Sequence, residues 1–195
     1  AAPARPRRGT WRTVAFARAA EDLAVGSITL TGGGPDSVCS GGDQRVRGDT
    51  GAVAECAAVG RFHITDLHVQ IRRTPKPVVA MVAGYAIGGG QVLHVVCDLT
   101  IAAENARFGQ TGPRVGSFDG GFGASLLARQ IGQKRAKEIW FLCRQYDAAR
   151  AYEMGLVNAV GPPERRGAGT VPWCAGRQTT SPVTRPLPKA AAPPH

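Results

Sequence analysis

Residues 78–83, Val-Val-Ala-Met-Val-Ala, form an uninterrupted apolar run with the length of a β-strand. A run without polar alternation is typical of a strand that is buried on both faces, as in the parallel sheets of α/β proteins. The preceding Thr-Pro-Lys-Pro at residues 74–77 ends any earlier helix, because a residue before proline avoids the α-helical region. The run therefore predicts a central strand in an α/β protein.

The rest of the chain reads as further strands and helices separated by glycine and proline. Strands are expected at residues 25–31, 38–40, 98–102 and 156–160, and helices at 11–23, 62–73, 91–97, 124–131, 133–142 and 147–154. Asp147 is the expected N-cap of the last helix and Gly155 its C′ residue. Residues 45–60 are ambiguous, a loop and then a helix. The first helix is expected to bury one face, made of Trp11, Val14, Ala15, Ala19 and Leu23.

The net charge of +10 comes from the two ends of the chain. Residues 1–20 hold five arginines and no acid, and residues 161–195 hold five basic residues against Glu164. The remaining residues are nearly neutral, which argues against a nucleic-acid partner. We therefore expect an irregular segment at residues 1–10, a core at 11–160 and a tail at 161–195, where eight of the fourteen prolines lie.

Five scattered cysteines without C-x-x-C spacing indicate free thiols in a reducing, cytoplasmic compartment. Histidines and cysteines do not share metal-ligand spacing, so no metal site is expected. We expect surface or core-edge positions without catalytic roles for His63, His68 and His94. A solvated helix face is expected for Lys134, Arg135 and Lys137. No apolar run approaches the ~18 residues of a membrane span.

The loop at residues 108–123 holds six glycines and a single acid, Asp119. Glycine lets main chain approach a ligand closely, so the loop could hold Ser117 and Asp119 against a small molecule. A flexible surface turn is the alternative, and Asp119 could instead cap the helix that follows Gly121.

A strand–glycine–helix pattern occurs twice, at Ser-Gly-Gly-Asp (40–43) and Ile-Gly-Gly-Gly (87–90). Each turn can aim unpaired backbone N–H groups at an anion or a developing oxyanion. Neither turn fits a Walker A loop or G-x-G-x-x-G, which weakens a nucleotide-phosphate reading. Two tight turns without a ligand remain the alternative.

Three segments together resemble the crotonase (enoyl-CoA hydratase/isomerase) superfamily: residues 40–43, 75–90 and 97–103. Within it, residues 41–48, 108–121 and 138–147 are similar to the 1,4-dihydroxy-2-naphthoyl-CoA synthases, lyases of menaquinone biosynthesis. The resemblance covers about residues 11–160. It implies a crotonase-like ββα spiral core, without the usual N-terminal strands and with residues 161–195 in place of most of the C-terminal helical region.

The resemblance also implies roles for residues at matching positions. Gly42 and Gly89 match the two oxyanion-hole amides, Asp119 the catalytic aspartate, and Ser117 a serine near the second substrate carbonyl. A bicarbonate pocket is implied for Gln110, Thr111, Gly112 and Trp140, since a second subgroup has aspartate in place of Gly112 and needs no bicarbonate. Contacts to substrate or CoA are implied for Arg45, Arg47, Ser40, Gly41, Asp43, Gln44, Tyr85 and Gly88.

The implied reaction is an intramolecular Claisen ring closure of o-succinylbenzoyl-CoA with loss of water. CoA enters as part of the substrate, and bicarbonate is the implied base. The family forms trimers, often paired as hexamers, so a homo-oligomer is expected. Two alternatives stay open. Another crotonase-type hydratase or isomerase would need a glutamate in residues 108–123, which hold none. A non-catalytic acyl-CoA-binding remnant would need no catalytic Asp119.

Overall fold

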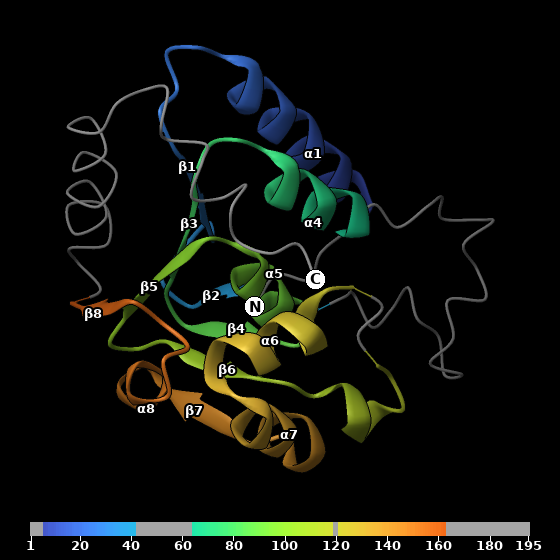
Figure 1. The fold of residues 1–195 in the computed structure, drawn as a ribbon, viewed down its shortest axis with the longest axis vertical. Helices are drawn as coiled ribbons and strands as arrows, with labels where there is room; N and C mark the ends of the chain where they lie inside the picture. The colour runs from blue at the N-terminus through green and yellow to red at the C-terminus, as the bar shows by residue number, and fades with distance from the viewer. Residues whose placement is uncertain (1–5, 42–63, 119–120, 163–195) are drawn as a thin grey trace.

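The computed structural model describes residues 6–41, 64–118 and 121–162 of the 195-residue chain, with side chains from residue 13 onward (Figure 1). The expectations for residues 45–60 and for the 161–195 tail therefore lie outside the described residues, except at 161 and 162. The described strands are β1 (Ile28–Thr31), β2 (Ser37–Cys39), β3 (Val78–Val82), β4 (Tyr85–Ile87), β5 (Leu99–Ala103), β6 (Arg107–Gly109), β7 (Gln145–Asp147) and β8 (Ala159–Gly161). The helices are α1 (Pro6–Glu21), α4 (Ile64–Arg73), α5 (Gly89–Val96), the 3₁₀ turn η1 (Gly112–Val115), α6 (Gly123–Ile131), α7 (Gln133–Leu142) and α8 (Ala148–Glu153).

The strands form two four-stranded sheets whose members alternate along the chain from β1 to β6. The first sheet has the order β1-β3-β5-β8 and is parallel throughout. The second has the order β2-β4-β6-β7, parallel except for the antiparallel β6–β7 pair. Because β1 leads to β2, β3 to β4 and β5 to β6, each turn of the chain adds one strand to each sheet before a helix returns.

The buried core surrounds α5 and the central strand β3. Val78, Val79 and Val82 are fully buried, which confirms the two-sided burial predicted from the apolar run. Figure 1 shows α5 in the middle of the molecule, with the paired helices α1 and α4 on one side and α6 and α7 on the other. Nearly every side chain of α5 is buried, because strands and helices cover it on all sides.

Helix α1 differs from its prediction in both its start and its buried face. It begins at Pro6 rather than residue 11, consistent with the preference of proline for the first turn of a helix. The predicted face was wrong. Val14 and Leu23 are exposed, and Phe16 joins the core cluster that contains Leu67 and Ile71 of α4. The bulkiest apolar side chain described in α1 thus faces α4, an alignment that spacing within α1 alone did not reveal.

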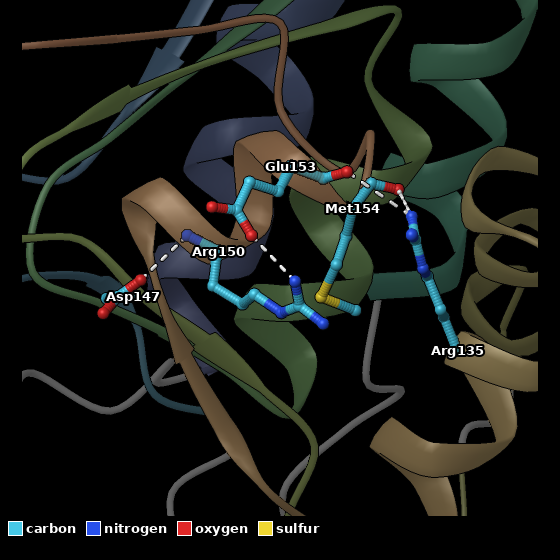
Figure 2. A network of polar contacts seen from close by, with 5 residues as sticks. All are labelled: Arg135, Asp147, Arg150, Glu153 and Met154. Carbon is cyan, nitrogen blue, oxygen red and sulfur yellow. Dashed lines mark hydrogen bonds and ion pairs between the residues drawn. The ribbon is translucent and has the colours of Figure 1, made fainter.

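Helix α8 has the predicted caps at both ends. The Asp147 side chain accepts a hydrogen bond from the Arg150 N–H at 2.8 Å, and Gly155 follows with φ of +77°. An additional contact closes the end of this helix: the Arg135 guanidinium of α7 donates to the carbonyl oxygens of Glu153 (3.5 Å) and Met154 (3.0 Å) (Figure 2). Arg135 is exposed together with Lys134 and Lys137, as predicted for a solvated helix face, and its guanidinium binds the C-terminal carbonyls of α8.

Among the described residues, no helix combines the length and the apolar character needed to cross a membrane.

Candidate functional site

Three neighbouring strands of the second sheet bring the candidate residues to one edge. Ser40 and Gly41 follow β2, Gly88 and Gly89 follow β4, and Gln110 and Thr111 follow β6. Since β2, β4 and β6 are adjacent and parallel, their carboxyl ends meet at the same edge of the sheet. This edge is where α/β sheets commonly bind ligands.

The two glycine turns touch through their main chains. Gly41 has φ of +101° and Gly88 has φ of +59°, conformations that glycine adopts without strain. A Cβ atom placed on Gly89 would lie 3.6 Å from the Gly41 Cα, so backbone meets backbone here. The turns predicted separately from the sequence therefore lie side by side.

The start of α5 provides hydrogen-bond donors at this contact. The first backbone bond within α5 runs from the Val92 N–H to the Gly88 carbonyl at 3.1 Å. The N–H groups of the preceding helical residues, Gly89 among them, have no partner inside the helix. They carry the positive end of the helix dipole, which suits a developing oxyanion.

Gln110 and Thr111 lie against the Gly88 turn. The Gln110 amide is buried and donates to the Gly88 carbonyl at 3.4 Å, while the Gly88 N–H donates to the Gly109 carbonyl at 3.0 Å. A Cβ on Gly88 would lie 3.6 Å from the Thr111 Oγ1. Two residues of the implied bicarbonate pocket are therefore neighbours of the glycine turn.

Gly112, Ser117 and Trp140 form the adjoining part of the site. The Ser117 N–H donates to the Gly112 carbonyl at 2.8 Å, which closes the η1 turn. A Cβ on Gly112 would lie 3.8 Å from Cζ3 of Trp140, so the indole packs beside this glycine. The exposed Phe118 ring lies across Trp140 with centroids 4.9 Å apart.

The indole nitrogen of Trp140 is the polar atom of the site that points most directly to a bound ligand. The Trp140 side chain is 5% exposed, and its buried indole Nε1 has no hydrogen-bond acceptor among the described residues. An unpaired buried donor costs about 1–3 kcal/mol, so such atoms usually mark the place of a water, an ion or a ligand. An acceptor-rich anion at this indole N–H would fit the donor.

The other predicted site residues are placed as follows. Ser40 is exposed at the end of β2. Tyr85 lies at the opposite, amino end of β4 with 47% of its surface exposed, so the structure does not group it with the glycine turns. Six predicted site residues lie outside the described residues: Gly42, Asp43, Gln44, Arg45, Arg47 and Asp119.

The expected surface or core-edge positions of His68 and His94 were wrong, since these side chains are 3% and 2% exposed and lie within the core; His63 lies outside the described residues. The His94 Nδ1 lies 3.2 Å from the Thr100 Oγ1, and its ring meets Phe108 edge-on with centroids 5.0 Å apart. Burial lowers the His94 pKa from 6.5 to about 3, so the neutral ring packs as an aromatic core residue. The apolar neighbours of His94 along α5 were the available signal for this burial.

Sequence reasoning gave Cys39 no role beyond that of a free thiol and included Gly90 only as the last residue of the 87–90 glycine turn; both residues flank the glycine contact. Both are buried, Cys39 at the end of β2 and Gly90 in the first turn of α5. Cys39, Cys97 and Cys143 carry free thiols.

Comparisons with a protein family and with solved structures point to the same group of proteins. The enoyl-CoA hydratase/isomerase family profile matches residues 12–182. The enoyl-CoA hydratase of Bacillus anthracis is 29% identical, with a TM-score of 0.87 over 95% of this chain and 71% of that protein. The enoyl-CoA hydratase subunit I of Geobacillus kaustophilus is 27% identical, with a TM-score of 0.85 over 97% and 72%.

A Legionella pneumophila protein described as an enoyl-CoA hydratase/isomerase (crotonase) is 26% identical, with a TM-score of 0.86 over 97% of this chain and 73% of that one. These likenesses confirm the α/β fold that the sequence predicted.

Proposed function

Because this chain belongs to the enoyl-CoA hydratase/isomerase family, we propose that it stabilises the enolate of a CoA thioester. The specific reaction proposed is ring closure of o-succinylbenzoyl-CoA to 1,4-dihydroxy-2-naphthoyl-CoA, a step of menaquinone biosynthesis. The motif resemblance at residues 108–121 and 138–147 supports this choice within the family. The observation that carries it is the buried indole N–H of Trp140, which has no acceptor among the described residues, on a ring whose Cζ3 edge packs beside Gly112.

The residues around Trp140 fit a small, acceptor-rich anion. Gln110 and Thr111 add polar side chains beside Gly88, and the missing side chain of Gly112 lets the Ser117 carbonyl and the Trp140 ring pack close to its backbone. Bicarbonate, when bound by Gln110, Thr111, Gly112 and Trp140, would supply the base for the substrate's α-proton. No described side chain at this edge of the sheet is a carboxylate that could serve instead.

The chain's own groups would stabilise charge on two substrate oxygens. The Gly89 N–H, with that of Gly42, would hold the thioester oxygen as the enolate forms. The α-carbon then bonds to the carbon of the substrate's benzoate carboxyl, and the carboxyl oxygen leaves as water while the new ring aromatises. Asp119 would transfer a proton at the second carbonyl, and Arg45 or Arg47 would pair with the benzoate.

The decisive measurement is turnover of o-succinylbenzoyl-CoA by the full chain with and without bicarbonate. Trp140→Phe keeps the packed ring but removes the N–H donor. We expect the bicarbonate concentration for half-maximal rate to rise about tenfold, as the loss of a hydrogen bond to a charged group predicts. Phe141→Leu, an exposed neighbour on α7, is the control and should leave this concentration unchanged. A rate that does not respond to bicarbonate would contradict the proposal.

A second candidate is hydration of an enoyl-CoA, the activity named in the B. anthracis and G. kaustophilus relatives. Turnover of crotonyl-CoA without turnover of o-succinylbenzoyl-CoA would favour it. If the chain binds acyl-CoA and Asp119→Asn has no effect on any turnover rate, the protein would instead be a non-catalytic acyl-CoA binder. For the ring-closing enzyme, Asp119→Asn should lower kcat by about 10²-fold or more.

A further inference from the structure

Of the glycines at the site, Gly90 lies most tightly against the backbone of another segment, that of Cys39. A Cβ atom on Gly90 would overlap the Cys39 carbonyl oxygen, well inside the shortest distance that real Cβ atoms show, and would also lie 3.1 Å from the Cys39 Cβ. The absent side chain at Gly90 therefore lets the end of β2 rest directly on the first turn of α5. The β2–β4 pairing shifts register between Ser37 and Cys39, which marks the irregularity at this contact.

Cys39 also contacts the opposite glycine turn. Its Sγ donates to the Gly41 carbonyl at 3.7 Å, a weak hydrogen bond typical of a thiol. Through its carbonyl Cys39 touches the turn that begins α5, and through its thiol it holds the turn that follows β2. One buried residue thus links the two segments whose main chains meet at Gly41 and Gly89.

We propose that Gly90 and Cys39 are positioning residues that set the separation of the two glycine turns. This inference rests on the proposed function, because the separation matters only if both turns hold one thioester oxygen. Neither residue would touch the substrate. Gly90 acts by having no side chain, and Cys39 acts by holding the Gly41 carbonyl.

The steric consequence of adding one methyl group can be stated from the geometry. In Gly90→Ala, β2 and α5 must separate by roughly 1 Å, because the obstructing atom is a main-chain carbonyl that cannot rotate away. A displacement of about 1 Å in a catalytic arrangement can lower the rate by about 10²-fold. We therefore expect kcat of Gly90→Ala to fall by about 10²-fold, with KM changed by less than about threefold.

The control must separate misplacement of the turns from general strain. Gly32→Ala provides it, because a Cβ on Gly32 would overlap the Ser37 carbonyl at the other end of β2, also a main-chain clash. If Gly32→Ala loses as much thermal stability as Gly90→Ala but retains kcat, the effect belongs to the glycine turns. Equal loss of kcat in both variants overturns the proposal.

A spectroscopic readout tests the position of the donors directly. The probe is benzoyl-CoA labelled with ¹³C at the thioester carbonyl. Benzoyl-CoA has no α-hydrogen, so it cannot form an enolate. Bound to the unmodified chain, its carbonyl stretch should move to lower wavenumber, as expected for an oxygen that accepts hydrogen bonds. Gly90→Ala should still bind benzoyl-CoA but lose at least half of this shift in the carbonyl stretch. Cys39→Ala should lose a smaller part of the shift, and Cys39→Ser should restore it.

The outcomes distinguish this inference from the proposed function. If the unmodified chain gives a carbonyl shift and Gly90→Ala gives the same shift, the positioning role is wrong and the enolate chemistry stands. If the unmodified chain binds benzoyl-CoA without any shift, the oxyanion hole itself is wrong, and both proposals fall together.

Discussion

His94, in the last turn of α5, is a buried titratable group. Its ring contacts Thr100 and Phe108, and its pKa falls to about 3 because burial disfavours the charged form. The unfolded chain binds a proton at this residue near pH 6.5, and the folded chain does not. Stability from the neutral ring is therefore complete above pH 6.5 and declines as the pH falls toward 3.

We expect His94→Asn to reduce the pH dependence of stability. Below pH 6.5, the free energy of unfolding of the unmodified chain should fall by up to about 1.4 kcal/mol per pH unit through this residue. Asparagine can still donate to Thr100 but has no such titration. Urea unfolding at pH 5, 6 and 7 measures the effect, and parallel slopes for the two chains would contradict it.

Gly112 is a second residue whose small size has a measurable role. A Cβ here would lie 2.5 Å from the Ser117 carbonyl oxygen, so even alanine must push the η1 turn apart. We expect Gly112→Ala to lose about 1–3 kcal/mol of stability, as overpacking predicts, and to weaken the response of turnover to bicarbonate. Gly33→Ala, where an added Cβ meets open space, is the control for stability measured by urea unfolding. An unchanged bicarbonate response in Gly112→Ala would separate this glycine from the pocket.

At the scale of elements, α8 is held by a different group at each end (Figure 2). Asp147 caps its N-terminus and also pairs with Arg107 at 3.7 Å, with both side chains about half exposed. Arg135 binds its last carbonyls. Since surface ion pairs contribute little, the N-cap should account for most of the stability that Asp147 contributes.

Asp147→Ala should therefore cost about 1 kcal/mol of unfolding free energy, the usual effect of losing an N-cap. Asp147→Asn keeps a side-chain oxygen for the Arg150 N–H but removes the charge. It should cost only a few tenths of a kcal/mol, the size of an exposed ion pair. Denaturant unfolding of the two variants compares these terms, and equal losses would assign the stability to the ion pair instead.

Most of the elements that the sequence predicted have enough residues to show a pattern. Helices α4, α6 and α7 and strands β3 and β5 were expected close to their observed bounds, because each has a periodic or continuous apolar run. Strands β4, β6 and β7 have three residues each, too few for any period, and were not predicted, whereas the equally short β2 and β8 were expected at residues 38–40 and 156–160. They exist because neighbouring strands pair with them, which is information from distant parts of the chain.

Only part of the candidate site, too, could be predicted from the sequence. The glycine turns after β2 and β4 were predicted from local order, and their contact follows from the adjacency of these strands. The Cys39–Gly90 contact could not be predicted, because it depends on a register shift in a three-residue strand. The roles of Asp119, Arg45 and Arg47 remain predictions from the family resemblance.

At the scale of the whole molecule, the crotonase-like fold links its two sheets at every turn of the chain. No two successive strands from β1 to β6 belong to the same sheet, and α5 packs against strands of both. Neither sheet can open without disrupting the helices and turns that it shares with the other. The described core should therefore unfold as one cooperative unit.

Hydrogen exchange at increasing denaturant should test this cooperativity. The inner strands, each flanked by a strand on both sides, are β3 and β5 in the first sheet and β4 and β6 in the second, and the amides of all four should lose protection at the same denaturant concentration. Mass spectrometry of the corresponding peptides measures both sheets in one sample. Loss of protection in the second sheet at clearly lower denaturant would show that the sheets open separately.

The contact between Gly41 and Gly89 has a consequence for how such a protein can be dissected. The groups that would grip a reacting oxygen are peptide amides, so an alanine scan would change the shape of the backbone and leave every N–H in place. Only exchange of a single amide for an ester, at Gly89 for example, would delete the donor without adding a methyl group. Substitutions of side chains around the site can accordingly change which substrate binds, while the backbone N–H groups that stabilise the negative oxygen stay the same.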